Sequence, residues 1–179
     1  MLQIREASAA DAPELAAVAA ATFALACPPT TAQESIDEFI AGQLSEARFD
    51  EYLAADERMI LLAEEAPGSL ALGYAMLVFA EPADPDVAAS VSIRPTVELS
   101  KFYVMPNHHG GAVAAPLMAA VLAAATRGPS ESVWLGVNQQ NARARRFYEK
   151  SGFRIVGEKS FMVGPERHDD FVLERLVAP

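Results

Sequence analysis

The second half of the chain alternates strand-like and helical segments, and this order restricts the folds that it can adopt. From residue 97 onward the pattern predicts a strand, a helix, a strand, a helix and a final pair of strands, over residues 97–104, 112–125, 132–137, 142–150, 153–163 and 170–177. Strands that alternate with single helices imply some parallel pairing, and the strand pair around Gly164 and Pro165 implies antiparallel pairing. The sequence therefore predicts a mixed sheet in an α/β (α+β) fold.

The first half of the chain supplies further strands. Residues 2–5 alternate apolar and polar side chains, as in a short edge strand. Residues 59–63 and 70–79 predict two strands joined by a polar loop, which is the pattern of a hairpin. Residues 81–95, rich in acidic residues and proline, predict a loop that either shapes a binding site or is only a connection.

Two or three helices are expected between the first strand and the hairpin. Asp11 and Glu14 have the spacing of a capping box, and they predict a helix that ends near Ala26, before two prolines. Helical periodicity resumes at residue 31 and continues to residue 44. Ser45 either begins another helix or lies within the same one.

Composition indicates one domain without disulfides or a structural metal. The 179 residues suit a single domain, expected over residues 1–179, and a chain of this size buries roughly 70% of its unfolded surface. Cys27 is the one cysteine, so it has no internal partner and no C-x-x-C pair exists for zinc. We therefore expect a domain that folds without metal.

Charge and hydropathy exclude several function classes. No long apolar run follows a basic N-terminus, and the apolar helix 112–125 is shorter than a membrane span, so we expect a cytoplasmic protein without a membrane partner. A formal net charge of −10 disfavours nucleic acid as a partner and would attract a cationic substrate. A pocket lined with backbone amides can still bind an anion on such a surface.

The first stretch that suggests chemistry runs from Val104 into the helix 112–125. Bulky side chains are absent from Gly110 to Ala115 except at Val113. Such a turn lets a phosphate approach the unpaired amides of a helix N-terminus, although a tight turn could need glycine for backbone reasons alone. Because proline is tolerated only in the first helical turn, Pro116 predicts a helix start near Ala112 or Val113. The stretch has neither a Walker lysine nor G-x-G-x-x-G.

The second stretch covers residues 137–153. A strand ends in a polar run, and a helix follows with Ala144, Phe147 and Tyr148 at helical spacing. Gly152 is placed to end this helix before Phe153 begins the next strand. On this pattern alone, the two aromatic residues could simply face the core.

Together, the two stretches resemble the GCN5-related N-acetyltransferase superfamily. The family pattern Asn-x-x-Ala-x-x-x-Tyr-Glu-x-x-Gly-Phe is complete from Asn141 to Phe153. The other family pattern, Gln/Arg-x-x-Gly-x-Gly/Ala, keeps its spacing, with His109, Ala112 and Ala114 at the defining positions. The resemblance covers about residues 96–163.

This resemblance implies a GNAT fold, with a mixed, mostly antiparallel sheet of about seven strands flanked by about four helices. It implies acetyl-CoA as acyl donor and no metal. The residues that would bind the donor are Phe102, Tyr103, Val104, His109, Gly110, Gly111, Ala112, Val113, Ala114, Ala115 and Asn141. Ala112 in place of glycine is expected to weaken this binding rather than abolish it, and His109 either reaches a phosphate or is an exposed loop histidine.

The resemblance also implies two catalytic residues. Tyr148 would be the general acid that protonates the departing CoA thiolate, unless it is only a structural aromatic. Gly136 stands where some members carry a catalytic glutamate. Members often carry a carboxylate at the position of Glu98, so the resemblance implies that Glu98 is the base, directly or through a water, with a solvated strand carboxylate as the alternative.

The implied activity is N-acetyl transfer from acetyl-CoA by direct attack of a primary amine in a ternary complex. The amine would belong to a small molecule or to a protein N-terminus. The alternative is a catalytically inactive acyl-CoA-binding or regulatory module of the same fold. Homodimers are frequent among the relatives, so a homodimer is a further expectation.

Overall fold

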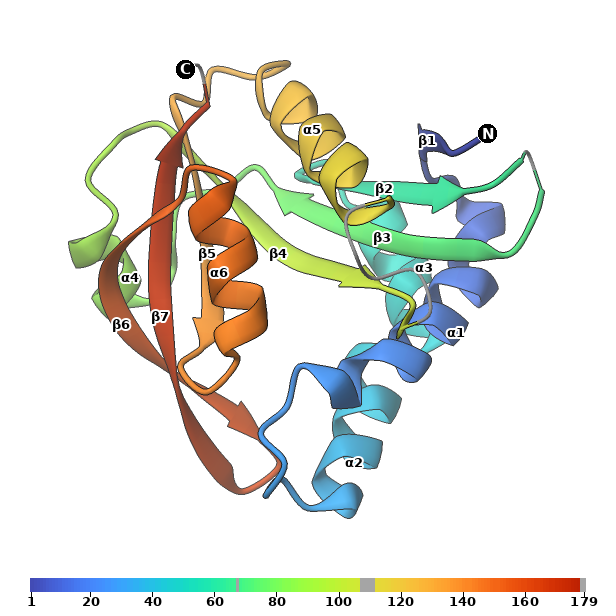
Figure 1. Ribbon diagram of the computed structural model, residues 1–179, viewed down its shortest axis with the longest axis horizontal. Helices are drawn as coiled ribbons and strands as arrows, with labels where there is room; N and C mark the ends of the chain where they lie inside the picture. Colours follow the sequence, from blue (N-terminus) through green and yellow to red (C-terminus); the bar gives the residue numbers. More distant parts are fainter. Residues whose placement is uncertain (67, 107–111, 178–179) are drawn as a thin grey trace.

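Seven strands form one open sheet with helices on both faces (Figure 1). The computed structural model describes residues 1–66, 68–106 and 112–177. The strands are β1 Gln3–Glu6, β2 Arg58–Glu64, β3 Ala71–Val78, β4 Thr96–Val104, β5 Ser132–Asn138, β6 Arg154–Val163 and β7 Glu166–Leu176. The α-helices of the described residues are α1 Ala12–Thr22, α2 Gln33–Gln43, α3 Glu46–Ala54, α4 Pro85–Ser90, α5 Ala114–Ala125 and α6 Ala142–Lys150.

The sheet order is β1-β2-β3-β4-β5-β7-β6, and every neighbouring pair is antiparallel except β4 with β5. This confirms the predicted mixed, mostly antiparallel sheet of seven strands. The hairpin of β2 and β3 and the final pair of β6 and β7 form as predicted. The one parallel pair arises because α5 carries the chain across the sheet between β4 and β5.

Both faces of the sheet are buried, because alternate residues of the central strands point to opposite sides. In β2, Leu61 and Ala63 join the core cluster that contains α5 and α6, whereas Ile60 and Leu62 join the cluster of α1, α2 and α3. A third, smaller cluster packs α4 against Trp134. Two helix layers therefore enclose the sheet and can meet only where its strands separate.

Three sequence predictions need correction. Residues 81–95 contain the helix α4, whose N-cap Asp84 accepts hydrogen bonds from the amides of Asp86 and Val87. The predicted capping box is wrong: the Asp11 carboxylate instead accepts from Ser8 and Arg5. The helix expected from residue 112 begins at Ala114, which puts Pro116 in the first turn.

Two helix boundaries agree closely with the sequence. Ser45 is the N-cap of α3 and accepts from the Arg48 amide, so a separate third helix begins there. The α6 helix covers the predicted residues. None of the helices in the described ranges has the length and apolar character needed to cross a bilayer.

A partly buried ion-pair network connects the edge strand β1 to α1 and β2. The Arg5 guanidinium donates to both carboxylate oxygens of Asp11, at 2.9 and 2.8 Å, and to Glu64 Oε1 at 3.0 Å. Glu64 is fully buried and Asp11 is nearly so. The bonds to Arg5 hold the pKa of Asp11 well below its usual range.

We expect Arg5→Met to lower the free energy of unfolding by about 3 kcal/mol, because two buried carboxylates would lose their counter-ion. Urea denaturation at pH 7 measures this change. The loss of unfolding free energy caused by Arg5→Met should be largest above about pH 4 and should shrink as the pH falls below that value. The lowered pKa of Asp11 stabilises the unchanged protein only while that carboxyl group is ionised.

Arg127→Met is the matched control for this substitution. Arg127 pairs with Glu6 at 3.3 Å, and both side chains are more than half exposed, so its loss should cost less than about 1 kcal/mol. Equal losses in the two variants would contradict the role given to the Arg5 network.

Candidate active site

The two central parallel strands separate after three paired positions. The pairs of β4 and β5 are Thr96 with Ser132, Val97 with Val133, and Glu98 with Trp134. Just beyond, the register of β4 against β3 shifts so that Ser100 is an extra residue, and such a bulge bends a strand. The later residues of both strands line a cavity of about 640 Å³.

The cavity passes from one face of the sheet to the other through this separation. On one side it is lined by Ala114 of α5 and by Asn141, Ala144, Phe147 and Tyr148 of the α6 segment. On the other side it is lined by the end of α1, the segment to Cys27, and the β6–β7 pair. The arrangement can therefore hold two molecules that approach each other from opposite faces.

A defined helix end positions Tyr148. Gly152, with φ of +88°, takes the left-handed conformation after α6, and its amide donates to the Glu149 carbonyl. The Phe153 amide donates to the Tyr148 carbonyl at 3.0 Å, and the two rings lie 5.9 Å apart. This is a Schellman motif with its hydrophobic contact, and it explains why glycine and phenylalanine follow the tyrosine at this spacing.

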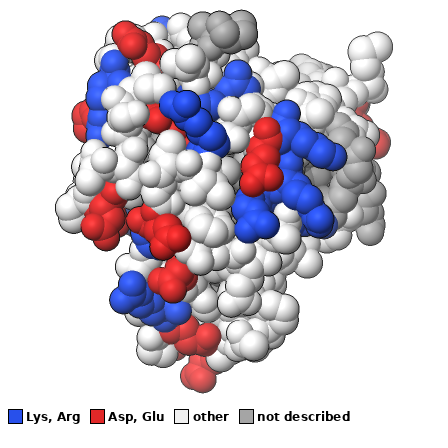
Figure 2. Space-filling view, turned by 60° about the vertical axis from the view of Figure 1, so that its left-hand side comes forward, with Lys and Arg blue, Asp and Glu red and all other residues white. Residues whose placement is uncertain are grey.

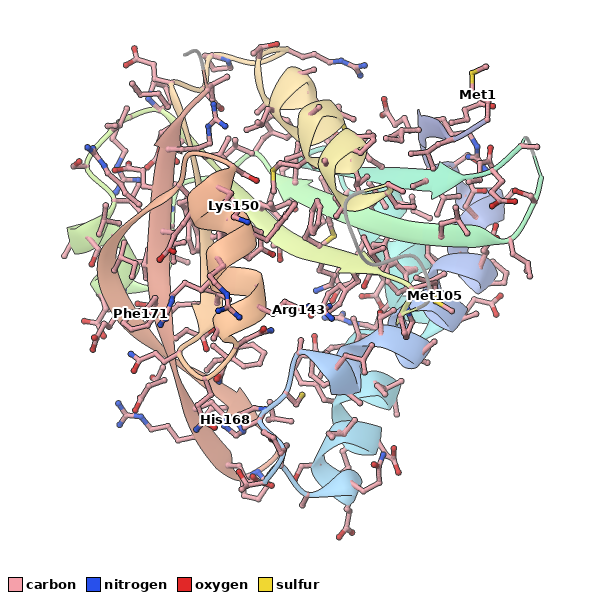
Figure 3. The ribbon with its side chains drawn as sticks, viewed as in Figure 1. Met1, Met105, Arg143, Lys150, His168 and Phe171 are labelled. Carbon is pink, nitrogen blue, oxygen red and sulfur yellow. The ribbon has the colours of Figure 1, made fainter. Side chains whose placement is uncertain are left out.

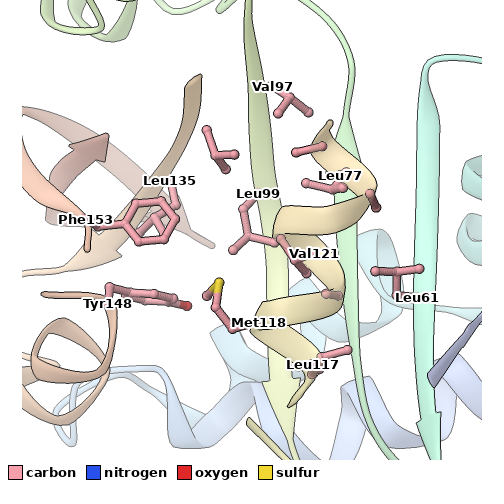
Figure 4. Close-up of a cluster of buried hydrophobic side chains, with 14 of the residues drawn as sticks. Leu61, Leu77, Val97, Leu99, Leu117, Met118, Val121, Leu135, Tyr148 and Phe153 are labelled. Atoms are coloured by element: carbon pink, nitrogen blue, oxygen red, sulfur yellow. The ribbon is translucent and has the colours of Figure 1, made fainter. Parts of the chain in front are cut away.

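Tyr148 lies in a cluster of aromatic rings and is one of the residues that line the cavity. Its ring is 6.2 Å from Phe102 and 5.6 Å from Phe147. Figure 4 shows the hydroxyl directed away from Phe153, toward Met118 of α5. Burial raises the pKa of Tyr148, so the phenol remains protonated at neutral pH.

The beginning of α5 lies at the same cavity. Ala114, the first residue of the helix, lines the cavity. The N-cap Val113 has a buried side chain, so only its backbone is available to a ligand. Ala112 and Ala115 are exposed. The first intrahelical bond runs from the Leu117 amide to the Val113 carbonyl, so earlier amides have no partner within the helix. His109, Gly110 and Gly111 lie outside the described residues.

The other predicted donor-binding residues also line the cavity. Phe102, Tyr103 and Val104 belong to the part of β4 that has left β5. Asn141 is the N-cap of α6, and its side-chain oxygen accepts from the Ala144 amide at 3.1 Å. Asn141 therefore has a structural role that the sequence analysis missed.

Basic side chains gather over α6 on the acidic molecule (Figure 2). Arg143, Arg146 and Lys150 line the cavity, whereas Arg145 forms an ion pair with Glu149 at 3.7 Å. The positive charge at this rim is suited to an anionic ligand.

Glu98 lies in the cavity wall where the two strands part. Burial raises the pKa of its carboxyl, and the neighbouring Lys159 and Lys101 oppose that change. Burial also lowers the pKa of Lys101 to about 8, against the opposing effect of Glu98. Glu98 is partly buried, and whether it acts as a base stays a prediction.

The sequence analysis missed three titratable residues, Lys159, His168 and Asp170, which line the cavity from β6 and β7. A Cβ at Gly136 would lie 2.5 Å from Lys159 Cε and 3.4 Å from Asp170 Oδ2, so the absent side chain leaves room for both. Figure 3 shows His168 beside the segment that joins α1 to α2. In the sequence, the only features that could have pointed to these residues are the glycine at position 136 and the charged residues in and around the predicted final strand pair.

Known proteins resemble this chain in sequence and in fold. The sequence profile of the Acetyltransferase (GNAT) family matches residues 21–153. An uncharacterized N-acetyltransferase of Mycobacterium tuberculosis is 48% identical over 165 residues, which cover 92% of this chain and 97% of the relative.

Solved structures show the same fold. The PaiA N-acetyltransferase of Thermoplasma acidophilum, in complex with coenzyme A, matches with a TM-score of 0.76 at 19% identity over 98% of this chain and 99% of its own. The ribosomal-protein-S18-alanine N-acetyltransferase of Escherichia coli matches with a TM-score of 0.68 at 14% identity over 100% and 96%. Since the family profile matches most of the chain and a close relative matches nearly all of it, the chain belongs to the GNAT acetyltransferase family.

Proposed function

We propose that the protein transfers an acetyl group from acetyl-CoA to a primary amine, by direct attack of the amine while both substrates are bound. The observation that carries the proposal is that Tyr148, Glu98 and the beginning of α5 all lie on one cavity that opens through the sheet. Relatives with the N-acetyltransferase name and a structural neighbour that holds coenzyme A support it.

The residues present suit acetyl-CoA on the α5 and α6 side. The amides of residues 112–115 would bind the pyrophosphate at the positive end of α5, and Pro116, which has no amide, follows them. Phe102, Tyr103 and Val104 would receive the pantetheine along β4, and Asn141 would contact it from α6. Bound there, acetyl-CoA supplies a thioester carbonyl that an amine can attack.

Glu98 and Tyr148 would share the proton transfers. Glu98 accepts a proton from the ammonium group of the acceptor, which frees the nitrogen lone pair to form the new C–N bond. As the C–S bond breaks, Tyr148 donates its phenolic proton to the leaving sulfur. The aromatic cluster around Tyr148 excludes water from this transfer.

We expect Ala114→Glu to weaken binding of acetyl-CoA at least about tenfold, because its carboxylate would oppose the pyrophosphate. A glutamate at the first helical position favours the helix, so stability should be retained. The thermal shift with increasing CoA measures the change. Ala119→Glu, on an exposed position of the same helix, is the control of equal charge and should bind as before.

Tyr148→Phe should lower kcat about 10²-fold while the KM for acetyl-CoA changes little, since only the donated proton is lost. Release of the CoA thiol with a panel of amines measures kcat. Tyr74→Phe is the control, because Tyr74 is also buried, does not line the cavity and should leave kcat unchanged. Retained CoA binding without thiol release by the unchanged protein would favour the inactive-module alternative.

The kcat of the unchanged protein at saturating acceptor should fall as the pH drops through the raised pKa of Glu98, because a base acts only when ionised. Glu98→Gln should lower kcat at every pH and remove this dependence. A pH series of kcat for both proteins provides the measurement, with the exposed Glu57→Gln as control. An unaltered acid limb in Glu98→Gln would assign the base to another group.

A further inference from the structure

The carboxylate of Glu166 joins the β6–β7 pair to the first turn of α2. Its Oε1 atom accepts from the Ala32 amide at 3.0 Å and from the Ser35 hydroxyl at 3.2 Å. Ala32 is the N-cap of α2 and has no side-chain oxygen, so a residue 134 positions away in the sequence binds the beginning of this helix. The negative charge also lies at the positive end of the helix dipole, where it is stabilising.

The β6–β7 turn and α2 are in direct contact at this point. A Cβ on Gly164 would lie 2.9 Å from Ser35 Oγ, and Ser35 is buried. Figure 1 shows the tip of the β6–β7 pair beside the beginning of α2 and the segment that leads to it from α1. Among the residues that the structure describes, the two bonds to Glu166 are the hydrogen bonds that join α2 to this strand pair.

The same elements form an apolar wall of the cavity. The Phe39 ring of α2 lies 5.6 Å from the Phe161 ring of β6, and it stacks at 4.4 Å on Phe23, which follows α1. These three rings line the cavity together with Val163 of β6, whereas Glu166 and its two partners do not. Glu166 can therefore affect the cavity only through the elements that it joins.

Cys27 lies in this wall and gives a way to observe it. The thiol lines the cavity, is half-buried and donates to the Phe23 carbonyl at 3.6 Å. Burial raises the pKa of Cys27 to about 11, and the Glu166 carboxylate adds to this change. Because Cys27 is the one cysteine of the chain, its reaction with a thiol reagent reports how often the wall opens.

We infer that Glu166 is a positioning residue for acceptor binding, because its two hydrogen bonds hold the segment from α1 to α2 against the β6–β7 pair and keep this wall of the cavity closed. The inference rests on the proposed function, which puts acetyl-CoA on the α5 and α6 side and leaves this side to the acceptor. Without these bonds only apolar contacts join the two elements, so the wall would open more often.

The test compares Glu166→Gln with Glu166→Met. Both variants lose the charge and have side chains of similar size, but only glutamine keeps an oxygen that can accept the two hydrogen bonds. Glu158→Met is the control, because Glu158 is exposed on the same strand pair. Mass spectrometry measures the rate at which N-ethylmaleimide modifies Cys27. The thermal shift with CoA is recorded for each protein, with kcat and KM for each amine of the panel that supports thiol release.

Cys27 should react at least about tenfold faster in Glu166→Met than in Glu166→Gln, because the loss of two hydrogen bonds favours opening. The two variants lack the same charge, so this difference does not come from the pKa of the thiol. The KM for the acceptor should rise at least about threefold in Glu166→Met, because binding must then order the wall, while kcat and the CoA thermal shift change less than about twofold.

Glu166→Gln should keep the KM of the unchanged protein, and Glu158→Met should match that protein in every measurement. Ser35→Ala removes one of the two bonds from the other partner and should give an intermediate rate at Cys27. This variant tests the inference even where Glu166→Met does not fold.

Equal Cys27 rates in Glu166→Met and Glu166→Gln would overturn the inference. So would a Glu166→Met variant that loses kcat and the CoA thermal shift as strongly as acceptor binding, because that result indicates a general loss of structure. If Cys27 reacts faster in Glu166→Met but the unchanged protein acetylates no amine of the panel, the proposed function fails while the closing role of Glu166 stands.

Discussion

The early separation of β4 from β5 is the constraint on which the rest of this structure depends. Only three residue pairs join the one parallel pair of the sheet, and the bulge at Ser100 turns β4 away directly afterwards. The sheet is buried on both faces and lies between the two helix layers. The gap between β4 and β5 is therefore the place where the two sides of the sheet connect. It brings together Tyr148 from α6, Glu98 from β4 and Asp170 from β7, which lie far apart in the sequence.

The two ends of the cavity differ in how they supply charge. On the α5 and α6 side, unpaired helix amides and the basic rim suit an anion, although the whole chain carries −10. On the other side, the Lys159 ammonium lowers the pKa of both Glu98 and the buried Asp170. Low solvent access strengthens each of these local interactions, so the net charge of the surface predicts neither end of the site.

Most of the fold could be predicted because its signals are local. The period-2 and period-3.6 patterns located nearly every strand and helix, and the spacing from Asn141 to Phe153 predicted α6 with Gly152 at its end. The wrong predictions concern side chains that have more than one possible hydrogen-bond partner. Asp11 does not cap its helix because the Arg5 guanidinium is the stronger partner, and Asp84 caps a helix in a segment rich in proline that predicted only a loop.

The sequence alone predicted the family, the order of every element except α4, and the two residues expected to transfer protons, because those features depend on spacing along the chain. Only the tertiary structure decided which side chains share the cavity with them. Lys159, His168 and Asp170 come from strands that pair at the far end of the sheet. Gly136 is informative only because the side chains of Lys159 and Asp170 occupy the space beside it. Burial and the lack of a hydrogen-bond donor, which distinguish Asp170 from the exposed Asp169 beside it, are properties of packing that no local pattern records.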